Sequence, residues 1–226
     1  MGDYEMLEQL TKNIREWVFK SEKAVIIGVS GHGAAGKTTF VSELIEQFEP
    51  HKVNYINTDP YIVDSTIRKK TIIQYTYENE PHSFKMTACH PGAHHLPSLE
   101  RDVRMIREGV DFYTIDVPYL ERTLISAQNQ LTIVEGMSVA FLQPKYFDIT
   151  IYFYTDGDTE FKRRSERDTN ERGMNIDYLR QSHEERRIQY EVFMHPYREQ
   201  FDVVINTTNE GIVIEKMDLN LSKEEM

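Results

Sequence analysis

The residues best suited to chemistry in this sequence form one short glycine-rich segment. Residues 31–38 read Gly-His-Gly-Ala-Ala-Gly-Lys-Thr and match the pattern G-x-x-x-x-G-K-[S/T]. Small residues let backbone N–H groups close around phosphate oxygens, and a helix that begins there directs its positive end at them. Lys37 adds a point charge for the β- and γ-phosphates, and the Thr38 hydroxyl suits Mg²⁺. We call this segment the phosphate loop. It predicts binding of a nucleoside triphosphate by Gly31, His32, Gly33, Ala34, Ala35, Gly36, Lys37, Thr38 and the following Thr39.

Two carboxylates stand where apolar runs end. Glu135 follows the run 131–134, and a carboxylate at a strand end can bind Mg²⁺ directly or through water. Asp59 follows the run 53–56. In phosphoryl transfer, a carboxylate at that position can orient an acceptor hydroxyl and take its proton. The alternative for Asp59 is an aspartate that only caps a loop.

A local excess of positive charge lies between residues 162 and 172 of an otherwise acidic chain. Its members are Lys162, Arg163, Arg164, Arg167 and Arg172. They are compatible with a solvated helix face paired with neighbouring acids, and such surface pairs contribute little stability. They are also compatible with a lid whose guanidinium groups neutralise charge on a transferred phosphoryl group. The phosphate loop favours the lid.

Hydrophobic periodicity indicates which elements position these groups. Continuous apolar runs predict buried strands at 24–29, 53–56, 131–134, 148–154 and 203–205. Helical spacing predicts an amphipathic helix at about 3–20 and further helices at 40–50, 96–109 (with Ser98 as N-cap), from about 158, and 177–195. Residues 111–126 suggest a hairpin, and the residues after Asn206 suggest a peripheral helix or frayed tail. This alternation predicts an α/β fold, a three-layer arrangement around a mostly parallel sheet in one domain, residues 1–226.

Composition restricts the environment and the partners. The chain has 26 Lys and Arg against 37 Asp and Glu, a formal net charge of −11. Nucleic-acid binding is disfavoured, because it depends on neutralising phosphates with basic residues. Cys89 is the only cysteine, and the first residues lack a signal-peptide pattern, so we expect a cytoplasmic protein. The apolar runs are too short for membrane insertion.

Several short motifs occur in one order across residues 24–206. They cover residues 28–39, 58–61, 90–91, 134–136, 154–158, 163–164, 167–168, 171–173 and 201–206. Together they resemble the uridine kinase and phosphoribulokinase family. The resemblance implies a P-loop kinase fold that binds ATP and Mg²⁺ and transfers the γ-phosphoryl group to a hydroxyl of a small molecule.

The resemblance also implies roles for individual residues. Lys37 and Thr38 would bind phosphate and Mg²⁺, Asp59 would be the general base, and Glu135 would belong to the magnesium shell. Arg164, Arg167 and Arg172 would take lid positions and take part in catalysis. Acceptor contacts would come from Tyr61, His90, Arg167 and Arg172.

The acceptor half departs from the family pattern in three places. The family's Tyr-Asp-Phe segment with a following His-x-Arg has no clear counterpart in residues 115–122. Cys89 stands where uridine kinases carry an aspartate before the His-Pro pair, and Met174 stands where they carry a second arginine. The acceptor therefore stays open among nucleosides and other small alcohols, as do the choice of ATP or GTP and the oligomeric state, with a homo-oligomer compatible with the sequence. A nucleotide-binding regulatory module without catalysis is the alternative function.

Three imidazoles within six residues, His90, His94 and His95, offer a second kind of chemistry. Such a cluster could recruit a transition metal. We favour a substrate contact for His90 and surface loop positions for His94 and His95, because no obvious further ligand beyond Cys89 completes a set.

Overall fold

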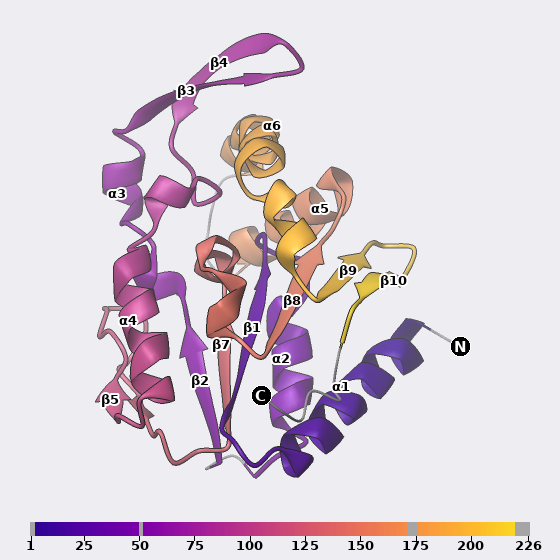
Figure 1. Ribbon diagram of the computed structural model, residues 1–226. Coiled ribbons are helices and arrows are strands. Elements are labelled where there is room, and N and C mark those ends of the chain that lie inside the picture. The colour runs from indigo at the N-terminus through magenta and orange to yellow at the C-terminus, as the bar shows by residue number, and fades with distance from the viewer. Residues whose placement is uncertain (1–2, 50–51, 171–175, 220–226) are drawn as a thin grey trace.

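The apolar runs build the central sheet of the computed structural model, which describes residues 3–49, 52–170 and 176–219. The strands are β1 (Val25–Gly31), β2 (Val53–Asn57), β7 (Leu131–Glu135), β8 (Ile149–Tyr154), β9 (Val203–Thr207) and β10 (Ile212–Met217). Their order across the sheet is β10-β9-β8-β1-β7-β2. All neighbours pair in parallel except β10, which is antiparallel to β9. The expected α/β fold with a mostly parallel sheet is confirmed (Figure 1).

Helices cover both faces of this sheet, which explains why its central strands are apolar throughout. Alternate residues of β1 face opposite sides, since successive side chains of a strand point to opposite faces. Val25, Ile27 and Val29 belong to one core with α1 (Asp3–Lys20) and α2 (Lys37–Ile45). Ile26 belongs to a second core, to which α4 (Leu96–Arg107) contributes Leu99, Val103 and Ile106. Figure 1 shows the resulting layers.

The remaining elements surround the upper edge and one side of the sheet in Figure 1. They include α3 (Ser65–Arg68), the helices α5 (Gly157–Asn170) and α6 (Ile176–Phe193), and the hairpins β3 (Ile72–Tyr77) with β4 (Glu80–Lys85) and β5 (Phe112–Tyr113) with β6 (Leu124–Ile125). They also include the 3-10 turns η2 (Asp59–Tyr61), η3 (Pro91–Ala93), η4 (Met137–Phe141), η5 (Pro144–Tyr146) and η6 (His195–Gln200). No helix in the described ranges has the length and apolar character needed to cross a membrane.

Two local expectations were wrong. Residues 212–217 form β10 rather than a helix or frayed tail, because alternate side chains of Ile212–Met217 are half-buried when the strand pairs with β9, and residues 220–226 lie outside the described residues. The first residue of α4 is Leu96, and His95 is its N-cap, so Ser98 lies within the helix. Pro97 explains this early start, since proline fits the first turn of a helix.

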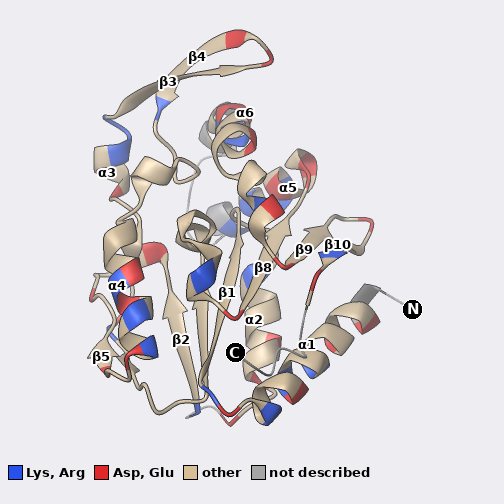
Figure 2. Ribbon diagram, in the orientation of Figure 1, with Lys and Arg blue, Asp and Glu red and all other residues tan. Residues whose placement is uncertain are grey.

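Parallel pairing brings the carboxyl ends of β1, β2, β7 and β8 to one edge of the sheet. The phosphate loop follows β1, Asp59 follows β2 after one residue, and Glu135 ends β7. Figure 2 shows Lys and Arg residues on α5 and α6 near this edge. The chemistry-bearing residues therefore meet where ligands of open α/β sheets commonly bind.

Candidate active site

The phosphate loop connects β1 to α2 through backbone conformations that favour glycine. Gly31 has a φ of 137°, and a β-carbon there would lie 1.8 Å from the carbonyl oxygen of Phe153. Gly36 is the N-cap of α2 with a φ of 95°. The loop borders a cavity of about 920 Å³, lined by Gly33, Ala34, Ala35, Gly36, Lys37, Thr38 and Thr39. Gly31 and His32, which we also expected at the nucleotide, do not line it.

Lys37 is a buried cationic residue that lines this cavity. The side chain is buried, and Nζ donates a hydrogen bond to the carbonyl oxygen of His32 at 2.9 Å. Nζ also lies 3.9 Å from Oε1 of Glu135. Burial lowers the pKa of Lys37, whereas the nearby carboxylates of Glu135 and Asp59 oppose that shift. A phosphate group would provide the compensating negative charge that a buried ammonium requires.

Thr38, Glu135 and Tyr55 form an oxygen-rich corner beside Lys37. The Thr38 hydroxyl lies 3.5 Å from Oε2 of Glu135, and the Tyr55 hydroxyl donates to the same oxygen at 2.7 Å. Mg²⁺ prefers hard oxygen ligands and commonly takes one or two from the protein, with phosphates and water supplying the rest. The hydroxyl of Thr38 and the carboxylate of Glu135 fit such an ion. Sequence reasoning missed Tyr55, which looked like an ordinary strand residue.

Asp59 also lines the cavity and is exposed. It is the first residue of η2, and its backbone N–H donates to Oδ1 of Asn57 at 2.8 Å. That hydrogen bond satisfies the backbone N–H, and Asp59 lines the same cavity as Lys37 and Thr38. A carboxylate so placed can accept a proton from a hydroxyl group bound beside the phosphate loop.

Two of the four expected acceptor contacts, Tyr61 and His90, do not line the cavity. Tyr61 is buried, and its hydroxyl donates to Oδ2 of Asp102 in α4 at 2.5 Å, so the side chain does not line the cavity. His90 is half-buried outside the cavity lining, where its Nδ1 accepts a hydrogen bond from the N–H of Gly92 and its ring contacts Phe193. Burial lowers the pKa of His90. Cys89 is fully buried.

His94 is also not the surface residue that we expected. Its ring is buried, with Nδ1 2.8 Å from the Ser138 hydroxyl and Nε2 2.9 Å from the carbonyl oxygen of Ala88. Burial lowers its pKa to about 4. His95 is exposed as expected. The three imidazoles therefore face different environments.

Hydrogen bonds of the His32 side chain connect the phosphate loop to the end of β8. Nε2 accepts a hydrogen bond from the backbone N–H of Thr155 at 2.9 Å, so the proton of the neutral ring is on Nδ1, which donates to the carbonyl oxygen of Gly33 at 2.8 Å. Burial lowers the pKa of His32 to about 4. Its side chain therefore stabilises the phosphate loop through these hydrogen bonds and does not line the cavity.

The basic residues of α5 divide between two environments. Arg163 reaches the phosphate loop and the turn after β9, with Nη1 3.4 Å from the carbonyl oxygen of Ala34 and 3.0 Å from the Thr207 hydroxyl. Arg163 and Arg167 line the cavity. Arg164 lies outside the lining, and its Nη1 is 3.8 Å from Oε1 of Glu160. Arg172 falls outside the described residues.

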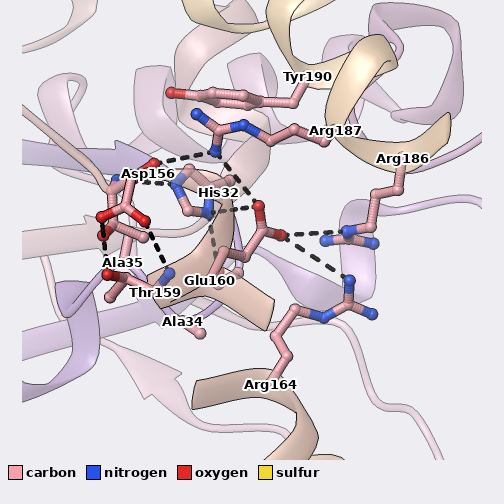
Figure 3. Close-up of polar contacts among 12 residues, drawn as sticks. His32, Ala34, Ala35, Asp156, Thr159, Glu160, Arg164, Arg186, Arg187 and Tyr190 are labelled. Atoms are coloured by element: carbon pink, nitrogen blue, oxygen red, sulfur yellow. Dashed lines mark hydrogen bonds and ion pairs between the residues drawn. The ribbon is translucent and has the colours of Figure 1, made fainter. Parts of the chain in front are cut away.

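Glu160 lies within ion-pair distance of further basic residues that sequence reasoning missed (Figure 3). Arg186 and Arg187 of α6 approach its carboxylate at 3.5 and 3.3 Å, and Arg186 also lines the cavity. These arginines belong to a strongly charged run, Glu184-Glu-Arg-Arg187, which is typical of a solvated helix face. No local signal distinguishes them, because their partner is a carboxylate 26 or 27 residues earlier in the chain.

Comparison with known proteins assigns the chain to a family. Residues 26–213 match the model of the phosphoribulokinase / uridine kinase family. A uridine kinase of Lactobacillus helveticus is 29% identical over 206 residues, which cover 86% of this chain and 92% of that protein.

Two solved structures support the fold at low sequence identity. D-glycerate 3-kinase from Cryptococcus neoformans var. grubii superposes with a TM-score of 0.59 at 11% identity, covering 92% of this chain and 99% of that one. Phosphoribulokinase from Rhodobacter spheroides superposes with a TM-score of 0.56 at 17% identity, covering 82% of this chain and 71% of that one.

Proposed function

Because the chain belongs to the phosphoribulokinase / uridine kinase family, we propose that it transfers the γ-phosphoryl group of ATP to a hydroxyl of a nucleoside-like or other small alcohol. One observation carries the proposal: the phosphate loop, Asp59 and Glu135 line the same cavity. A protein that only binds nucleotide has no need of a carboxylate that can accept a proton from an acceptor hydroxyl.

Each residue then has one task. The loop N–H groups and Lys37 bind the β- and γ-phosphates, and the charge of Lys37 stabilises the transferred group. Thr38 and Glu135 would hold Mg²⁺, which neutralises phosphate charge when bound. Asp59 orients the acceptor hydroxyl and takes its proton as the oxygen attacks phosphorus. Arg167 supplies further positive charge from α5, and the same role is proposed for Arg172. Arg164 would contribute only indirectly, because it lies outside the cavity lining beside Glu160.

The nature of the acceptor follows from relatives only in outline. The Lactobacillus helveticus relative is a uridine kinase, which favours a nucleoside among the candidates. Neither Tyr61 nor His90 lines the cavity, so the residues that bind the acceptor differ from those that the resemblance implied. A nucleoside or another small hydroxyl compound remains the proposed class.

The decisive experiment is a coupled ADP-release assay over nucleosides, sugar phosphates, pantothenate and related alcohols. Turnover that depends on one acceptor supports the kinase. ATP binding without turnover on any acceptor supports the alternative, a nucleotide-binding regulatory module.

Replacing Asp59 with asparagine then tests the catalytic assignment. Asp59→Asn keeps the size of the side chain but removes the base, so turnover on the identified acceptor should fall about 10²–10⁴-fold while ATP still raises the melting temperature. Asp218→Asn is the matched control, because Asp218 is 72% exposed beside Lys216. Full activity in Asp59→Asn would remove Asp59 from the catalytic role.

A further inference from the structure

Glu160 is a buried carboxylate that joins three parts of the molecule. Its side chain is only 2% exposed, and it is approached by His32 of the phosphate loop, by Arg164 of its own helix and by Arg186 and Arg187 of α6 (Figure 3). The surrounding positive charges outweigh the effect of burial and lower the pKa of Glu160 to about 2. Glu160 therefore stays ionised and fixes the guanidinium groups around it.

The arginines held by Glu160 are not equivalent. Arg187 does not line the cavity; its Nη1 donates to the carbonyl oxygen of Thr155 at 2.9 Å, and its guanidinium lies 4.5 Å from the Tyr190 ring centre. Arg186 lies at the boundary of the cavity instead. Its Nε is 3.5 Å from Oε1 of Glu160, and a β-carbon built on Gly33 would lie 3.4 Å from its Nη2. One edge of this guanidinium thus faces the carboxylate, while Nη2 lies near Gly33 of the phosphate loop.

Arg186 also adds to the positive charge around Lys37. Burial is the main cause of the lowered pKa of Lys37, and the charges of Arg167 and Arg186 contribute in the same direction. Cationic groups from the loop, α5 and α6 therefore converge on one cavity. Such convergence raises the electrostatic energy of the empty site and favours a ligand with several negative charges.

We propose that Arg186 is a phosphate-binding residue of this cavity, that it contacts the terminal phosphate of the triphosphate, and that Glu160 is the positioning residue that holds it there. The proposal rests on the proposed function only for the identity of the nucleotide. A planar guanidinium with one edge fixed can still present N–H groups to phosphate oxygens, which an unsupported arginine side chain would do at a larger cost in conformational entropy.

The test compares two nucleotides in the full-length chain by calorimetric titration. ATP and ADP differ by the terminal phosphate, so the ratio of their affinities reports contacts with that group. Arg186→Gln should weaken ATP binding about 10- to 100-fold, the range for a charge-assisted hydrogen bond, and change ADP binding much less. Glu160→Gln should shift the same ratio in the same direction by a smaller factor, because the guanidinium remains but is no longer held.

Two further variants complete the design. Arg180→Gln removes an exposed arginine from the same helix and should leave both affinities unchanged. Arg186→Lys keeps the charge but loses the planar fork, so it should retain part of the preference for ATP, and it serves if Arg186→Gln does not fold. An unchanged ratio of ATP to ADP affinity in Arg186→Gln, or in Arg186→Lys where only that variant folds, would overturn the proposal.

This readout requires no acceptor. A chain that shows the expected ratios but phosphorylates no compound would retain the assignment of Arg186 and lose the kinase function. A chain with turnover but unaltered ratios would retain the function and lose the assignment.

Discussion

Mild acid should destabilise this protein through histidines that fold into its interior in the neutral form. Burial lowers the pKa of His32 and His94 to about 4 and that of His195 to about 3, against an ordinary value of 6.5. In the unfolded chain these imidazoles bind protons as the pH falls through 6.5, whereas in the folded chain they do not until the pH approaches 4. The unfolded state therefore binds more protons in this window, and the free energy of unfolding falls with decreasing pH.

The magnitude follows from the shifts. Each histidine contributes about 1.4 kcal/mol per pH unit where only its unfolded form is protonated, so three give about 3 to 4 kcal/mol per unit between pH 6 and 5. A domain of ordinary stability has only about 5–15 kcal/mol in total. The lowered pKa of Glu160, about 2, acts in a different window, because its stabilisation is complete above pH 4.5 and is lost only below that value.

Urea denaturation at half-unit steps from pH 7 to 5 measures this slope. His94→Gln should reduce it by about one third, since one of three groups is removed. His95→Gln is the matched control, because the neighbouring imidazole of His95 is exposed. An unfolding free energy that does not change from pH 7 to 5, or a His94→Gln variant that keeps the full slope, would refute the reasoning.

Three other substitutions test single contacts. Lys37→Ala removes the buried ammonium from the phosphate loop and should lower turnover or ATP affinity about 10²–10³-fold, and calorimetry that finds ATP affinity unchanged together with unchanged turnover would contradict the loop assignment. Tyr55→Phe removes the hydroxyl that donates to Glu135 and should raise the Mg²⁺ concentration needed for half-maximal ATP binding about 10-fold, whereas Tyr146→Phe, which removes a similar hydrogen bond elsewhere, should not. Ile14→Ala empties a fully buried position in α1 and should cost about 2–5 kcal/mol in urea unfolding, and a cost below about 1 kcal/mol would show that α1 does not belong to the core.

The sheet could be predicted because its central strands are buried on both faces. The apolar runs at 24–29 and 131–134 carry that signal without reference to any other part of the chain. The hairpin of β3 and β4 carries no such signal, since its strands pair only with each other and much of their surface is exposed. Both residues of its turn, Glu78 and Asn79, have positive φ. Asparagine commonly adopts this conformation, but glutamate does not, so the turn has only a weak sequence signal.

The residues of the candidate site also differ in whether a short-range sequence pattern predicts them. The phosphate loop is local in sequence, so Lys37 and Thr38 could be assigned from spacing alone. Arg186 and Tyr55 act through partners far away in the chain, Glu160 and Glu135, and their positions depend on how α6 and β2 are placed against α5 and β7. Side chains whose role comes from tertiary contacts leave no pattern at short range.

Residues from near both ends of the described chain line the nucleotide cavity. Leu7 of α1 lines it, and so do the residues 207–212 that join β9 to β10. During synthesis the phosphate loop leaves the ribosome long before the β9–β10 turn does, so a nascent chain has the binding motif but not the completed cavity. A ligand that binds only the finished site stabilises only the finished fold. ATP would therefore act as a selective stabiliser of complete chains and give little protection to truncated ones.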